Sequence, residues 1–161
     1  MAKTLVLALG NLLRGDDGVG TAVCQSLLAY HPLPEGVELL DGGTPGLETA
    51  LLLEGCQRAI IIDAADMGLP PGEWRRFLPG DGRLPSRDAH LRGTMHYAGL
   101  AEALALGDAL GILPPEVVIY GIQPEDVGWQ EGLSAAVATA VPQVAAAVWR
   151  ELSRTGGQGD I

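Results

Sequence analysis

The sequence predicts one α/β domain in three layers, with a mostly parallel twisted sheet and helices on both of its faces. Short apolar runs typical of buried strands alternate along the chain with segments of helical periodicity. The 161 residues are enough for one domain with a sizeable core. Because no internal repeat or linker interrupts the pattern, we expect a domain over residues 1–155 and a flexible tail over residues 156–161.

The first half of the chain predicts three strands and two helices. The third strand is the clearest, because a β-branched run that ends before Asp63 suits a strand buried on both faces. Pro32 ends the first helix, and a dense turn signal at residues 41–46 closes the second strand. In order, we expect a strand over 4–9, a helix over 18–30, a strand over 37–40, a short helix over 47–54 and a strand over 59–62.

The second half predicts two further strands and two longer helices around one long loop. That loop, residues 78–93, is rich in Gly, Pro and charge, and its length favours a functional role. Pro142 falls inside the last helix and should kink or interrupt it. In order, we expect a strand near the sheet edge over 73–77, a helix over 95–107, a strand over 117–122 and an amphipathic helix over 133–153.

Charge and composition exclude several classes of function. Lys and Arg total 10 against 20 Asp and Glu, which gives a net charge of −10. We therefore expect neither a nucleic-acid partner nor an anionic membrane surface as a partner. No run approaches the roughly 20 apolar residues of a membrane span, and the apolar N-terminus lacks a signal-peptide cleavage site. These features predict a cytoplasmic monomer, in which Cys24 and Cys56 are reduced, buried side chains.

Polar side chains follow three neighbouring strands of the predicted sheet. Asp16 and Asp17 come after the first strand, Asp41 after the second and Asp63 after the third. The loop before His96 could reach the same edge. Because ligands of parallel sheets gather outside the carboxyl ends of the strands, these carboxylates and this imidazole are expected to converge there.

Carboxylates brought together repel one another unless a cation or a shared proton offsets their charge. The two carboxylates and one imidazole of Asp17, Asp63 and His96 suit Ni, Zn, Mn or Fe. A proton shared between two aspartates, as in aspartyl-type acid–base chemistry, is the other solution. Structural roles stay open at each position: a helix cap at Asp16 or Asp17, a turn at Asp41, a cap at Asp63, and a hydrogen-bonded His96.

Two other classes of enzyme do not fit the sequence. The glycines of residues 10–20 lack both the dinucleotide order and the Gly-Lys-Ser/Thr phosphate cradle, and two aspartates at the loop centre would repel a pyrophosphate. A serine nucleophile elbow is also missing from the sequence.

Five blocks of sequence, spread over nearly the whole chain, form an ordered set. The first block reads LGNLLRGDDGVG, and the blocks are residues 9–20, 41–46, 63–64, 96–100 and 121–125. Any one block alone is a weak signal, but together and in this order they specifically resemble the nickel-hydrogenase maturation endopeptidases.

The resemblance implies an endopeptidase that removes the C-terminal extension of a [NiFe]-hydrogenase large-subunit precursor after nickel insertion. The nickel would be supplied by the precursor, its partner, rather than held as a resident ion. Matched position by position, Asp17, Asp63 and His96 form the nickel-contacting and catalytic set. Asp17 stands where many relatives have Glu, and Asp41 matches a characteristic acidic position of unsettled role.

Two alternatives remain open from the sequence. A non-proteolytic nickel-binding escort for hydrogenase assembly would hold the metal or the precursor without cutting. A hydrolase with a resident metal would be purified with stoichiometric metal and would cleave simple peptides.

Overall fold

A computed structural model describes residues 3–79 and 95–154, and the side chains of residues 95–98 lie outside the description. The predicted tail at 156–161 and most of the predicted loop at 78–93 also lie outside the described residues. The described residues form ten elements. They are β1 (Thr4–Ala8), a 3-10 helix η1 (Gly15–Gly18), α1 (Val19–Tyr30), β2 (Val37–Asp41), α2 (Glu48–Leu53), β3 (Arg58–Ala64), β4 (Trp74–Phe77), α3 (Met95–Leu110), β5 (Glu116–Ile122) and α4 (Ala135–Ser153).

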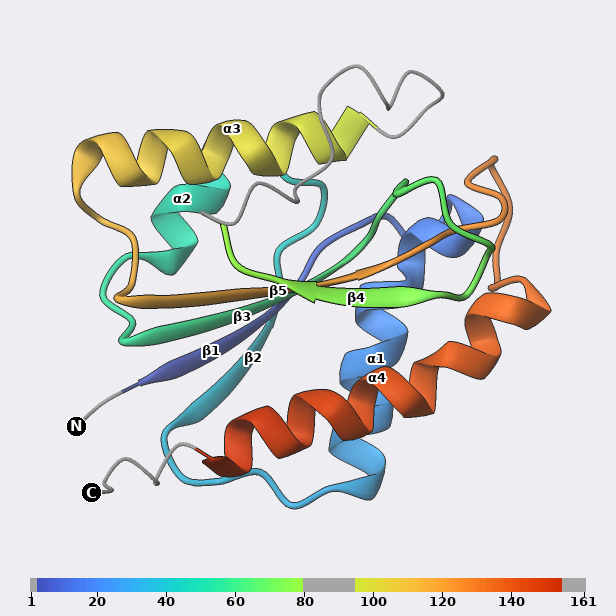
Figure 1. Ribbon diagram of the computed structural model, residues 1–161, viewed down its shortest axis with the longest axis horizontal. Coiled ribbons are helices and arrows are strands. Elements are labelled where there is room, and N and C mark those ends of the chain that lie inside the picture. Colours follow the sequence, from blue (N-terminus) through green and yellow to red (C-terminus); the bar gives the residue numbers. More distant parts are fainter. Residues whose placement is uncertain (1–2, 80–94, 155–161) are drawn as a thin grey trace.

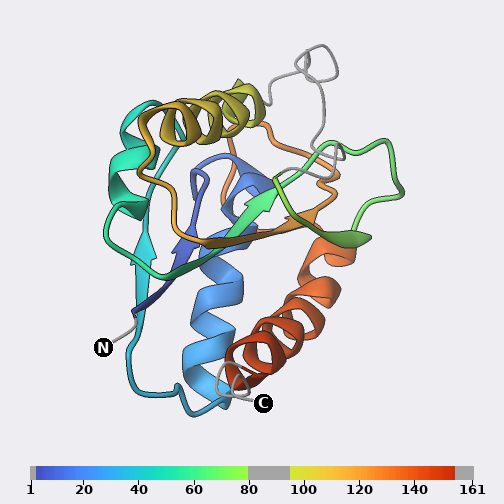
Figure 2. The ribbon, with the colours of Figure 1, turned by 60° about the vertical axis from the view of Figure 1, so that its left-hand side comes forward.

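The five strands form one sheet in the order β2-β1-β3-β5-β4. All neighbouring pairs are parallel except β4 with β5, which is antiparallel. Helices α1 and α4 cover one face of the sheet, while α2 and α3 cover the other (Figures 1 and 2). The predicted three-layer α/β architecture and the edge position of the strand at 73–77 are therefore confirmed.

The central strand β3 is buried along its whole length, as its isoleucine run predicts. Alternate side chains enter two separate cores. Ile60 and Ile62 pack on the side of α1 and α4. Ala59 and Ile61 pack on the side of α2 and α3. This alternation fixes the face to which each later residue of β3 belongs.

Helix α4 continues without a break through Pro142. The sequence predicts that this proline kinks or interrupts the helix, and the predicted interruption is wrong. Pro142 is exposed, and so is Ala138, whose carbonyl would otherwise accept the missing amide hydrogen. Water can therefore replace the lost hydrogen bond on the outer side of the helix. No helix within residues 3–79 and 95–154 is both long and apolar enough to cross a bilayer.

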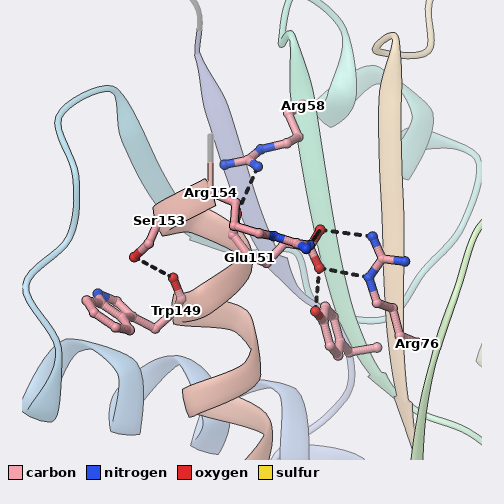
Figure 3. A network of polar contacts seen from close by, with 7 residues as sticks. Arg58, Arg76, Trp149, Glu151, Ser153 and Arg154 are labelled. Carbon is pink, nitrogen blue, oxygen red and sulfur yellow. Dashed lines mark hydrogen bonds and ion pairs between the residues drawn. The ribbon is translucent and has the colours of Figure 1, made fainter. Parts of the chain in front are cut away.

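A network of hydrogen bonds and ion pairs connects the end of α4 to the sheet (Figure 3). The buried Glu151 carboxylate accepts two hydrogen bonds from Arg76 of β4, at 2.8 and 2.9 Å, and one from the hydroxyl of Tyr120. Arg154 lies 3.5 Å from the same carboxylate, and the Glu151 carbonyl accepts from Arg58 of β3 at 3.1 Å. Burial alone would raise the pKa of Glu151, but the hydrogen bonds from Arg76 and Tyr120 outweigh it and lower that pKa.

Candidate functional site

Asp17 is held beneath the loop that follows β1. Gly10 has a φ of +127°, and a Cβ at this position would lie 1.9 Å from the Asp17 carbonyl oxygen. Only glycine permits so close a return of η1 over the end of the strand. The amide of Asn11 then donates to Asp17 Oδ2 at 2.9 Å. The Asp17 carboxylate is consequently fixed at the carboxyl edge of the sheet with its residue only 4% exposed.

Asp63 lies at the same edge but inside a strand. The expectation that it follows the third strand is wrong, because β3 continues through Ala64 and Asp63 pairs with Gly121 of β5. Pairing with β5 continues to Ile122 and extends β3 beyond its apolar run, which the apolar pattern could not reveal. Strand alternation directs Asp63 to the side of Ile61, the face covered by α2 and α3. The residue is 1% exposed.

The elements that carry the two carboxylates touch each other. The amide of Leu9 donates to the carbonyl of Ile62 at 3.0 Å, which places the end of β1 beside the residue before Asp63. The 3-10 helix η1, which contains Asp17, packs against β3. The structure thus brings two buried aspartates from separate segments to one edge, as the sequence predicts.

His96 falls in the first turn of α3, and its side chain lies outside the described residues. The backbone nevertheless locates this turn. A Cβ on Gly99, one turn later, would lie 2.7 Å from the carbonyl oxygen of Pro45. The loop that contains Pro45 is itself tied to the end of β1 by a hydrogen bond of 2.9 Å from Gly10 to Gly43. The start of α3 therefore lies at the same edge and on the Asp63 face.

Asp16 has a different task from the one expected. Neither Arg14 nor Gly18, the N-cap residues of η1 and α1, provides a side-chain cap, so the predicted helix-capping aspartate is not found there. The Asp16 carboxylate instead accepts from the amide and hydroxyl of Ser134, at 2.7 and 2.8 Å. It also accepts from the amides of Glu125 and Asp126, at 2.8 and 3.1 Å. Asp16 therefore joins the loop after β1 to the loop after β5.

Asp41 is the last residue of β2, so the expectation that it follows the second strand is wrong. Its side chain nevertheless forms a turn, as one reading of the sequence predicts. Its Oδ1 accepts from the amide of Gly43 at 3.0 Å. Its Oδ2 lies 3.5 Å from the Thr21 hydroxyl of α1. Asp41 thus shapes the loop on which the start of α3 rests.

Two residues that organise the site edge were not singled out from the sequence. Ser134 is the N-cap of α4, and a serine directly before a helical run is the signal that could have identified it. Gln123 accepts from the amides of Met67 and Leu69, at 2.6 and 3.3 Å, and so holds the loop after β3. A buried glutamine at a strand end has no comparable local signal.

The next question is whether the described side chains form a site for a metal ion. Among the described residues, no group of three or more His, Cys, Asp and Glu side chains is arranged to hold a metal ion. The predicted set includes the imidazole of His96, which lies outside the described residues, so Asp17, Asp63 and His96 remain a predicted ligand set. Cys24 and Cys56 are buried free thiols, as expected. Burial raises the pKa of Cys24 to about 12, which keeps its thiol protonated.

Comparison with known proteins gives a consistent family. The family model for hydrogenase maturation proteases matches residues 21–151. Hydrogenase expression/formation protein HupD of Bradyrhizobium diazoefficiens is 36% identical over 125 residues, which are 78% of this chain and 64% of that protein. Protein HoxM of Azotobacter vinelandii is 34% identical over 76% of this chain and 58% of its own length. The matched region thus spans about three fifths of these two relatives.

Relatives from Escherichia coli match over nearly their whole length. Its hydrogenase 2 maturation protease is 30% identical over 151 residues, which are 91% of this chain and 90% of that protein. The solved structure of its hydrogenase maturating endopeptidase HybD superimposes with a TM-score of 0.82 at 28% identity, covering 96% of this chain and 94% of HybD. The chain therefore belongs to the hydrogenase maturation protease family, a family of hydrolases.

Proposed function

We propose that this protein is an endopeptidase that removes the C-terminal extension of a [NiFe]-hydrogenase large-subunit precursor after nickel has been inserted. The observation that carries the proposal is the pair of buried carboxylates, Asp17 and Asp63, at one edge of the sheet. The first turn of α3, with His96, begins at that edge. Membership of the protease family supports cleavage rather than binding alone.

Two buried carboxylates suit a site that receives a cation. Carboxylate charge is costly away from water, and a divalent ion bound between the two side chains would offset it. In our proposal the nickel carried by the precursor is part of the substrate, and Asp17, Asp63 and His96 contact it. Recognition of that nickel would position the scissile bond beside the two aspartates.

Hydrolysis of a peptide bond requires a polarised carbonyl, an activated water and a proton for the leaving amine. Asp17 and Asp63 provide acceptors for the proton that the attacking water loses. The hydrogen bond from the Asn11 amide fixes the orientation of the Asp17 carboxylate through its Oδ2 atom. His96 would supply an imidazole, a side chain that commonly binds metal ions.

Intact mass spectrometry of a nickel-loaded large-subunit precursor tests the proposal. Incubation with this protein should produce a discrete mass loss from the precursor C-terminus. A stable complex without any mass loss would instead identify a nickel-binding escort. Cleavage of simple peptides by a metal-containing preparation, stopped by a chelator without any precursor, would identify a hydrolase with a resident metal.

A further inference from the structure

Three large apolar side chains are exposed next to the candidate site. Leu12 and Leu13 in the loop after β1 are 53% and 55% exposed, and Trp129 in the loop after β5 is 74% exposed. We refer to Leu12, Leu13 and Trp129 as the apolar platform. A group of exposed apolar side chains is unfavourable in water and marks a site of interaction, and tryptophan is enriched among the residues that contribute most to binding between proteins.

The backbone beneath the platform is held in place. The amide of Gln130, which follows Trp129, donates to the Leu13 carbonyl at 3.0 Å, and the Gln130 carbonyl accepts from Gly15 at 2.8 Å. Arg14 donates to the Val127 carbonyl at 3.0 Å, and its guanidinium lies 5.0 Å from the centre of the Trp129 ring. The backbone that carries the platform is therefore ordered before any partner binds, which lowers the entropic cost of binding.

The platform is continuous with the candidate site. Leu12 directly follows Asn11, whose amide is bonded to the Asp17 carboxylate. A Cβ on Gly18, the residue after Asp17, would lie 3.0 Å from the Leu12 side chain. A protein bound on the platform would thus lie against the loop that holds Asp17.

The loop that carries Trp129 is acidic. The loop after β5 adds the exposed carboxylates of Glu125, Asp126 and Glu131, and the chain as a whole has a net charge of −10. Arg14 is the single cation within the two loops, residues 9–14 and 123–134. An apolar patch beside an acidic loop is complementary to an apolar segment flanked by lysine or arginine.

We propose that the apolar platform is the docking surface for the body of the protein substrate, which presents an apolar segment flanked by basic residues. This inference rests on the proposed function, because the substrate is the large-subunit precursor. Docking on the platform supplies affinity that does not depend on nickel, whereas Asp17 and Asp63 respond to the metal. A protein substrate is thereby recognised at two adjacent places on one edge.

The experiment measures the dissociation constant and kcat/KM for purified nickel-loaded precursor with Trp129→Ala and Leu13→Ser. Removal of a central apolar contact should weaken binding and lower kcat/KM by about tenfold or more. Tyr30→Ala and Leu28→Ser are matched controls, because these side chains are 79% and 61% exposed at the far end of α1. The controls should bind and cut as the wild type does, and binding of the wild type should weaken at high salt.

The outcomes separate the docking surface from the proposed function. Wild-type affinity and cleavage in both platform variants would overturn the docking surface while leaving the peptidase intact. Binding by the wild type without cleavage would overturn the peptidase, and the loss of affinity in Trp129→Ala would still support the platform. Neither binding nor cleavage by the wild type would overturn both. Thermal unfolding of Trp129→Ala and Leu13→Ser distinguishes lost docking from lost stability, and Trp129→Phe, which keeps an aromatic ring near Arg14, should retain more affinity than Trp129→Ala.

Discussion

The carboxylate of Asp16 accepts hydrogen bonds from both the amide and the hydroxyl of Ser134, although the two residues are 118 positions apart. Asp17, the next residue, directs its carboxylate instead to the amide of Asn11. The two adjacent aspartates therefore have different roles. Asp16 has a structural role and joins two loops, while Asp17 belongs to the candidate site. This division gives each aspartate a distinct experimental consequence.

Asp16→Asn should destabilise the protein. The amide keeps one acceptor oxygen but loses charge, and it adds an NH₂ group where only donors approach. We expect the free energy of unfolding to fall by about 3 kcal/mol, as for other disrupted buried hydrogen-bond networks. Urea unfolding followed by circular dichroism measures the change. A variant as stable as the wild type would show that Asp16 does not secure the two loops.

Asp17→Asn should abolish processing of the precursor while the protein stays folded. Asparagine can still accept the hydrogen bond from Asn11, so the free energy of unfolding should change by about 1 kcal/mol or less. The lost charge should reduce cleavage at least about a hundredfold. Asp108→Asn, which removes an exposed carboxylate from α3, is the matched control and should cut normally. Full cleavage by a folded Asp17→Asn protein would remove Asp17 from the catalytic set.

His96→Ala should likewise abolish cleavage of the nickel-loaded precursor. The reason is the loss of the only nitrogen ligand in the predicted set. His31→Ala is the matched control, because the His31 ring stacks on Trp149 at 5.4 Å between ring centres, at the end of α1. The control should lose about 1 kcal/mol of stability but retain activity. Equal activity of both variants in the mass assay would contradict the assigned role of His96.

Glu151→Gln should lower stability in a pH-dependent way. The pKa of Glu151 in the folded protein lies below its ordinary value of 4.5, so its ion pair with Arg76 stabilises the fold fully above that pH. This contribution is lost as the pH falls through the lower, folded-state pKa. We expect the variant to be about 2 kcal/mol less stable at neutral pH, and the difference to shrink at an acidic pH below 4.5. Urea titrations at both pH values test this, and a difference independent of pH would exclude the ion pair as its cause.

The fold could be predicted because most strands and helices are indicated by the pattern of apolar residues within their own segments. The isoleucine run of residues 60–62 indicates a strand buried on both faces, and the structure has β3 at the centre of the sheet. The end of that strand could not be predicted. Asp63 is polar, and only its pairing with Gly121 of β5, far along the chain, extends the strand.

The sheet edge that carries the candidate site could be predicted from the sequence, but the contacts of the individual residues could not. Parallel strands end at one edge, so Asp17 and Asp63 could be assigned to it from sequence order alone. The role of Asp16 depends on Ser134 and on the loop after β5, which no local pattern near Asp16 reveals. The continuity of α4 through Pro142 likewise depends on which side of the helix faces water.

The central claim is that nickel carried by the precursor gates cleavage by this protein. The most direct measurement compares nickel-loaded and nickel-free forms of the same large-subunit precursor by intact mass spectrometry, each incubated with the wild-type protein. We predict a discrete C-terminal mass loss in the nickel-loaded sample and an unchanged mass in the nickel-free sample. Equal cleavage of both forms would contradict recognition through the metal at Asp17, Asp63 and His96.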